Sequence, residues 1–239
     1  MSSSEYQINE INTNYKMGFF SRSSLRSVLL VVIAINIVMT IIATFMYPPL
    51  LSMPHFYSYI LELGVMLLLY IAIVIWATRP SIDLTTLRIA TFFGVIAGFL
   101  EIVHISIEDF GHLNANSETI FTGIFMGGLF LLFAASGYRI AISIRNVVSG
   151  MLGASWSSVV CMLIVMTYGL SQLFWSFGAI EKHDIGDPDF IRSGWTDMHA
   201  FVIADIFEAC FKILFLGPIV GIIFGLIGAG IARLLWKKD

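Results

Sequence analysis

The chain has 239 residues, of which 58% are hydrophobic and only 12% are charged. Its mean hydropathy is +0.88 and its formal net charge is −3. This composition excludes a disordered chain and, without a basic stripe, a nucleic-acid-binding protein. The two cysteines, Cys161 and Cys210, lie inside apolar runs and offer no disulfide framework. The sequence therefore indicates an all-α polytopic membrane protein, with the lipid bilayer as its main surroundings.

Polar residues fill the first part of the chain, and apolar segments fill the rest. Residues 1–25 predict a disordered cytoplasmic tail, and residues 26–239 predict a transmembrane domain. Each apolar segment of that domain is long enough to cross the ~30 Å hydrocarbon core as a helix. The sequence thus predicts a bundle of six transmembrane helices, at about 27–47, 56–78, 87–108, 119–139, 147–177 and 196–235.

Basic residues mark the orientation of this bundle. With the N-terminus inside, ten of the thirteen Lys and Arg residues fall on the cytoplasmic side: Lys16, Arg22, Arg26, Arg79, Arg88, Arg139, Arg145, Arg233, Lys237 and Lys238. Cytoplasmic loops of membrane proteins carry such an excess. We therefore expect both termini in the cytoplasm and the chain in a plasma membrane or cell inner membrane.

The last two segments are longer than one crossing requires. We expect the fifth and sixth helices to project on the outer side, around 167–177 and 196–207. A kink at Gly217–Pro218 is an alternative for the sixth, because proline removes a helix hydrogen bond. The connection 178–195 is polar, and its Gly and Pro residues predict turns.

A few ionisable residues lie at membrane depth, where each costs roughly 2.5–3.5 kcal/mol and therefore needs a reason. Counting from the basic end of each helix places them toward the outer side. Glu101 and His104 stand at i, i+3 in the third segment, and Asp205 and Glu208 have the same spacing in the sixth. We expect these side chains to meet in one group, whose members are Glu62, Glu101, His104, Asp205 and Glu208.

Carboxylates and imidazoles gathered in this way are typical ligands of divalent transition metals. The sequence therefore predicts an outer-side site for Fe, Zn, Mn or Cu, or for protons. Nearby residues that would add ligands or support them are Glu108, His112, Asp197, His199 and Lys212. His104 is the only histidine deep in a span, so we expect no haem, and no nucleotide-binding loop is present.

Structural explanations compete with a functional one. Glu208 and Lys212 have the i, i+4 order that favours a salt bridge, which by itself would account for both charges. Glu101 would need only a polar neighbour, or a proton, to be tolerated in its span. Tyr, Phe and Trp side chains near the segment ends fit interfacial anchoring better than a ligand cage.

Glycines in the last segment predict close helix packing. Gly217, Gly221, Gly225, Gly228 and Gly230 form a small-residue stripe, which serves internal packing or contact with another copy or a partner subunit. No motif of serine hydrolases, P-loop enzymes or zinc proteases is present, so the sequence does not decide whether the protein is an enzyme. Three functions remain open: a metal protein, a proton-coupled or ion transport protein, and a non-catalytic subunit of a membrane complex.

Overall fold

The computed structural model describes residues 21–53, 56–111, 115–183 and 188–236, and within these ranges it contains helices and no strand. Its long helices are α2 (Arg22–Met46), α3 (Phe56–Ala77), α4 (Leu84–Phe110), α5 (Ala115–Ile144), α6 (Val147–Trp175) and α9 (Met198–Trp236). The shorter elements are η2 (Pro48–Ser52), α7 (Phe177–His183) and α8 (Pro188–Ser193).

Six helices are confirmed at the positions of the predicted spans, and each is long and apolar enough to cross a membrane. Side chains cap four of them where they begin, and at the start of α9 the cap is Asp197, which accepts from the Ala200 amide at 3.1 Å. Ser21 accepts a hydrogen bond from the Ser24 amide at 3.1 Å, Asp83 from Thr86 at 2.9 Å and Asn146 from Ser149 at 3.2 Å. The predicted tail lies outside the described residues up to residue 20, and α2 already begins at Arg22.

The connection predicted as turns contains two short helices. α7 follows α6 almost directly, and α8 begins at Pro188, because proline fits the first turn of a helix. Gly194, directly after α8, has a φ of +71°, which favours glycine and ends the helix. The turn signals at Pro188 and Gly194 are therefore correct as helix boundaries, although the segment between them is helical.

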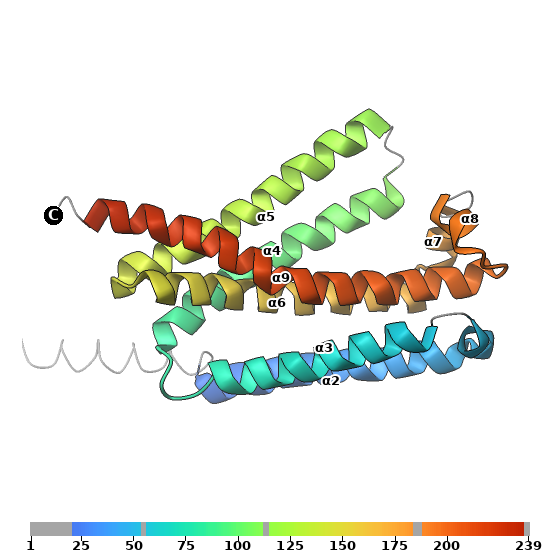
Figure 1. Ribbon diagram of the computed structural model, residues 1–239, viewed down its shortest axis with the longest axis horizontal. Coiled ribbons are helices and arrows are strands. Elements are labelled where there is room, and N and C mark those ends of the chain that lie inside the picture. The colour runs from blue at the N-terminus through green and yellow to red at the C-terminus, as the bar shows by residue number, and fades with distance from the viewer. Residues whose placement is uncertain (1–20, 54–55, 112–114, 184–187, 237–239) are drawn as a thin grey trace, which may run out of the picture.

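The long helices form three layers (Figure 1). α6 and α9 run antiparallel in the middle, α2 and α3 cover one side, and α4 and α5 cover the other. In the most apolar window of α6, 61% of the residues are buried, against at most 39% in any other span. α6 is therefore the central helix, and the outer helices leave large apolar side chains such as Phe45, Leu68 and Leu131 exposed, as lipid contact requires.

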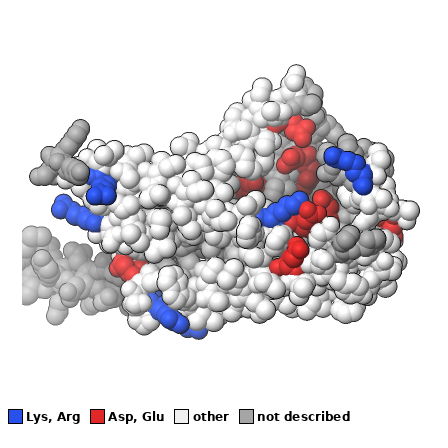
Figure 2. Space-filling view, in the orientation of Figure 1, with Lys and Arg blue, Asp and Glu red and all other residues white. Residues whose placement is uncertain are grey.

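Basic side chains predominate at one end of the bundle and acidic side chains toward the other (Figure 2). α2 begins and α9 ends at the same end, on the left in Figure 1. We call this the basic end, because Arg22, Arg79, Arg139, Arg145 and Arg233 lie in or near its helix termini. The other end, here called the acidic end, carries Glu108, Asp109, Glu118, Glu181 and Asp197, and acidic side chains gather toward it in Figure 2.

Small residues join α5, α6 and α9 in the basic half of the bundle. A Cβ added at Gly137 of α5 would overlap the Gly225 carbonyl of α9, and one at Gly228 would overlap the Ala134 carbonyl. At Gly221 an added Cβ would come within 2.6 Å of Ser158 Oγ on α6. The predicted glycine stripe therefore packs inside the chain at these positions, whereas a Cβ at Gly230 would meet nothing within 4 Å.

α9 is one continuous helix of 39 residues that includes Pro218. At about 1.5 Å per residue it is about 58 Å long, well beyond what a ~30 Å hydrocarbon core requires. Figure 1 shows its axis bending near the middle, where Pro218 interrupts the backbone hydrogen bonds. Toward the acidic end α5 diverges from α9 in the same view. This divergence opens the space in which the candidate site lies.

Candidate functional site

The centre of the candidate site is a pair of side chains on α4. Glu101 and His104 stand three residues apart and therefore share one face of the helix. Glu101 Oε1 lies 3.3 Å from His104 Nδ1, and only 8% of Glu101 and 3% of His104 are exposed. The structure thus buries an acid and a base in direct contact.

The second ring nitrogen of His104 contacts α5 and the end of α4. His104 Nε2 lies 3.4 Å from Thr122 Oγ1 and 4.0 Å from Glu108 Oε2, one turn further along α4. Phe125 of α5 stacks on the imidazole, with ring centroids 5.3 Å apart and an angle of 15° between the planes. This packing holds the ring so that its two nitrogens approach two carboxylates, Glu101 on the inner side and Glu108 on the outer side.

Glu101 has one oxygen that the described residues leave without a hydrogen-bond partner, the buried Oε2. Buried polar atoms are nearly always hydrogen bonded, and an unsatisfied one costs about 1–3 kcal/mol. The Glu101 charge also acts on Cys161, a fully buried thiol of α6. Glu101 therefore lies near the seam between α4 and α6, with hydrogen-bonding capacity that the described residues do not use.

A groove opens along this seam nearer the acidic end, with a volume of about 420 Å³. Glu108 and Asp109 line it from α4, and Asp205 lines it from α9. Gln172 of α6 donates from Nε2 to Asp109 Oδ2 at 2.7 Å, which ties the α4 wall to the α6 floor. The groove is the space left uncovered where α5 diverges from α9, and we call it the acidic groove.

A second group of charged residues lies between α3 and α9. Lys212 Nζ contacts Glu208 Oε1 at 2.6 Å, so the predicted salt bridge forms. The charges of Glu208, Glu62, Lys212 and Asp205 all act on the Tyr59 hydroxyl of α3. Glu62 and Lys212 are exposed, so this group lies on the outside of the bundle.

Of the five predicted ligands, only Glu101 and His104 are in contact with each other. Glu101 and His104 are buried in contact on α4, whereas Glu208 pairs with Lys212 on α9, Glu62 is exposed on α3, and Asp205 lines the acidic groove. Among the described residues, no three His, Cys, Asp or Glu side chains are grouped so that they could hold a metal ion. The described residues give no support for one pooled metal cluster, which stays a prediction. Helical phase places residues on a face of their own helix, but it does not say which neighbouring helix that face meets.

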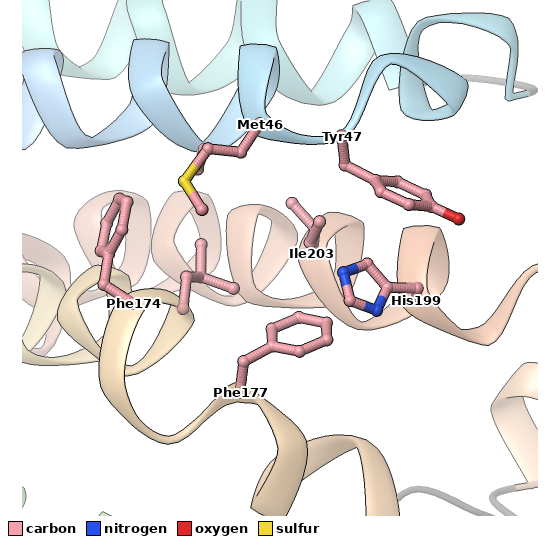
Figure 3. A pocket seen from close by; sticks show the side chains of 8 residues that line it. Met46, Tyr47, Phe174, Phe177, His199 and Ile203 are labelled. Atoms are coloured by element: carbon pink, nitrogen blue, oxygen red, sulfur yellow. The ribbon is translucent and has the colours of Figure 1, made fainter.

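Asp197 and His199 are part of a separate group of residues, located where the end of α2 meets the start of α9. Tyr47 donates from its hydroxyl to Asp197 Oδ2 at 2.6 Å, and His199 Nδ1 lies 3.5 Å from Glu181 Oε1. The His199 ring also packs on Phe177 and Tyr47, with centroids 4.1 Å and 4.5 Å away. These rings line a cavity of about 220 Å³ together with Met46 and Phe174 (Figure 3).

Contacts in this group shift two pKa values in opposite directions. The hydrogen bond to Asp197, burial and the charges of Asp197 and Glu181 raise the pKa of Tyr47. Burial works to raise the pKa of Asp197, but the bonds from Tyr47 and from the Ala200 and His199 amides outweigh it and lower that pKa. These shifts keep the Tyr47 phenol protonated and the Asp197 carboxylate ionised.

The remaining predicted site residue, His112, lies outside the described residues. Another hollow, of about 510 Å³, lies near the basic end between α3, α4 and α6. Its polar wall residues Asp83, Ser155 and Trp156 each make a hydrogen bond within the chain. Because its other wall residues are mainly apolar, we expect lipid chains to fill it.

Comparison of this chain with protein-family models, with curated proteins and with solved structures gave no match. The chemistry of the site therefore rests on its geometry. Sequence reasoning missed Thr122 and Tyr47 as partners of predicted residues, and Gln172 as the partner of Asp109. All three are common polar residues far along the chain from their partners or on another helix, and no spacing pattern links them.

Proposed function

We propose that this integral membrane protein binds protons at the Glu101–His104 pair and exchanges them with the acidic groove through Glu108. The observation that carries the proposal is the buried Glu101 carboxyl, with one oxygen on His104 and the other without a partner. An ionisable group at membrane depth is costly and is typically kept for a proton or ion pathway. A carboxyl group with a free oxygen can take up a proton without losing a hydrogen bond.

Proton exchange can follow the contacts already made. Glu108, whose side chain is 42% exposed, takes a proton from water in the groove. His104 accepts that proton at Nε2 and releases its Nδ1 proton to Glu101, so the imidazole ends neutral as it began. Phe125 hinders rotation of the ring, and the return path is therefore the reverse transfer. The Glu101–His104 pair therefore takes up and releases its proton at the acidic end.

The proposal includes an orientation with both termini in the cytoplasm and the acidic end outside. The support is the excess of Lys and Arg in the connections at the basic end. The proton site would then exchange with the outer solution.

Infrared difference spectroscopy tests the proposal directly. The purified protein in liposomes is titrated with pH, and the carboxyl stretching band of a buried protonated acid is recorded. We expect one such band to appear on acidification, to be absent in E101Q and to remain in E118Q, which removes an exposed acid of α5. An unchanged band in E101Q would refute the proposal.

A divalent metal is the second candidate, because Glu-x-x-His supplies a carboxylate and an imidazole. Two donors are in contact here, and further ligands would have to come from Glu108 or from water. Elemental analysis of the wild type, E101A and H104A decides between the two candidates. Stoichiometric Fe, Zn, Mn or Cu in the wild type, lost in both variants, would replace the proton by a metal.

A further inference from the structure

The hollow of about 510 Å³ near the basic end has the volume of a ligand pocket, which is about 300–1,000 Å³. It lies between the end of α3, the start of α4, the first turns of α6 and Pro218 of α9. We call it the basic-end hollow. Glu101, His104 and Glu108 are not among its lining residues, so what it binds is independent of the proposed function.

Polar and apolar residues of the basic-end hollow lie at different depths in the bundle. The polar ones near the helix ends are Ser81 and Asp83 in the α3–α4 connection and Ser149 in the first turn of α6. Leu152 and Val159 follow on α6, and Val159 is ten positions beyond Ser149, about 15 Å along the helix. The hollow thus extends from the level of the helix ends into the apolar depth of the bundle.

The inner part of the hollow offers water few partners. The Trp156 indole donates to Thr91 Oγ1 at 3.0 Å, and Ser155 Oγ donates to the Pro218 carbonyl at 3.4 Å, so both polar groups are already used within the chain. A buried water needs about two to four polar partners. Apolar walls gain dispersion contacts only from atoms that touch them. The inner walls therefore favour a hydrocarbon chain.

Two wall residues of the hollow are also surface residues. Trp76 of α3 is 51% exposed and Leu152 of α6 is 44% exposed, which opens the hollow toward the surrounding lipid. Trp156 lines the same hollow, but only 4% of it is exposed. A lipid chain can therefore enter sideways from the bilayer and reach a side chain that lipid around the bundle does not contact.

Basic residues lie beside the polar end of the hollow. Arg79 is exposed and comes two residues before Ser81, and its carbonyl accepts from Arg22 Nη1 at 2.5 Å and from the Ile82 amide at 3.2 Å. These bonds fix the connection to α2 and bring the Arg22 guanidinium group beside Arg79. The Asp83 carboxylate is used to cap α4, at 2.9 Å from an amide of its first turn. Basic side chains at headgroup level attract lipid phosphates.

We infer that the basic-end hollow binds one acyl chain of a phospholipid from the bilayer leaflet at the basic end. The phosphate lies at the α3–α4 connection, near Arg79 and Arg22, and the chain extends along α6 toward Pro218. The bound lipid fills the space between α3 and α6 and so joins the α2–α3 layer to the middle layer of the bundle.

Quenching of tryptophan fluorescence by bromine on a lipid chain tests this inference. The full-length protein keeps Trp156 and has its other four tryptophans replaced by phenylalanine. It is reconstituted into phosphatidylcholine liposomes with or without bromine midway along one acyl chain. We expect the brominated lipid to quench Trp156, although this side chain is only 4% exposed.

Blocking variants locate the quenching lipid. A77F and S149F add bulk to opposite walls of the hollow and should abolish most of the quenching. A72F, which changes an exposed residue of α3, is the matched control and should leave it unchanged. A protein with Trp76 alone is the positive control, because this exposed side chain should be quenched in any case. Circular dichroism and size-exclusion profiles show which variants are folded.

Three outcomes would overturn the inference. The first is an unquenched Trp156 in brominated liposomes that do quench Trp76. The second is equal quenching of Trp156 in A72F and in each folded blocking variant, which would mean that the lipid acts from outside the hollow. The third is quenching by a brominated fatty acid in ordinary liposomes but not by brominated phospholipid, which would make the occupant a free acid.

Discussion

His104 gives Glu101 the only hydrogen bond that the described residues supply to its carboxyl group. H104A should therefore leave a buried carboxyl with two bare oxygens and destabilise the protein by about 1–3 kcal/mol. The double variant E101L/H104L should recover much of that loss, because removing both polar partners leaves nothing unsatisfied. Unfolding midpoints in detergent measure both changes. Equal stability of H104A and the wild type would contradict the burial of this pair.

Tyr47 and Asp197 link α2 to α9 through a bond whose strength depends on pH. The pKa of Asp197 is lower in the folded protein than in the unfolded chain, where it is about 3.9. Its contribution to the free energy of unfolding is therefore present above about pH 3.9 and is lost as pH falls through the lower folded value. The pKa of Tyr47 is raised, so its contribution is present below about 10 and is lost as pH rises above that.

Y47F should therefore lower the unfolding midpoint at neutral pH, and the difference from the wild type should vanish at strongly acidic pH. Thermal unfolding of both proteins from about pH 8 down to about pH 1.5, below the lowered pKa of Asp197, measures this. Y57F, which changes an exposed tyrosine of α3, serves as the control. A difference between wild type and Y47F that is constant with pH would mean that the phenol acts by packing alone.

Residues within one helix were predictable, and contacts between helices were not. The Glu101–His104 and Glu208–Lys212 pairs follow from spacings of three and four residues, which place side chains on one face. Two other contacts depend on how separate segments pack together: that of Thr122 with His104, and that of Tyr47 with Asp197. Tyr47 and Asp197 are 150 residues apart in the chain, and no local pattern connects them.

At the scale of elements, glycines decide where helices touch. G137A adds a methyl group against the Gly225 carbonyl, which has no flexible side chain to move away, and overpacking of this kind costs about 1–3 kcal/mol. G123A, on the same helix, meets nothing within 4 Å and should stabilise α5 slightly. We expect opposite changes in the unfolding midpoint in detergent. A loss in both variants would instead indicate a partner covering α5 at Gly123.

Helix boundaries were well predicted because composition changes sharply there, and each predicted span lies within a few residues of its helix. The divergence of α5 from α9 was not predictable. It depends on where small residues permit close contact, at Gly137, Gly225 and Gly228, and on the bulk of neighbouring side chains elsewhere. The groove that follows from it is therefore visible only in three dimensions.

At the scale of the whole molecule, the unequal charge of the two ends is the basis of the proposed orientation, with the acidic end outside. Cysteines introduced singly at Ser117 and Ser143, after replacement of Cys161 and Cys210, report it. These serines lie near opposite ends of α5. An impermeant maleimide added to intact cells should label S117C at once and S143C only after lysis. The reverse pattern would place the acidic groove in the cytoplasm and contradict the proposed direction of proton exchange.

The path between the two ends decides whether protons are bound or conducted. From residue 213 to residue 232, α9 contains no ionisable side chain, and α6 has none between Val147 and Cys161. A proton on Glu101 therefore meets no titratable relay on these helices toward the basic end. Proteoliposomes with an internal pH dye should show no more passive proton leak than empty vesicles after an acid pulse, in the wild type and in E101Q alike. A leak that E101Q abolishes would show that the bundle conducts protons, and that the pair on α4 is one step of a complete pathway.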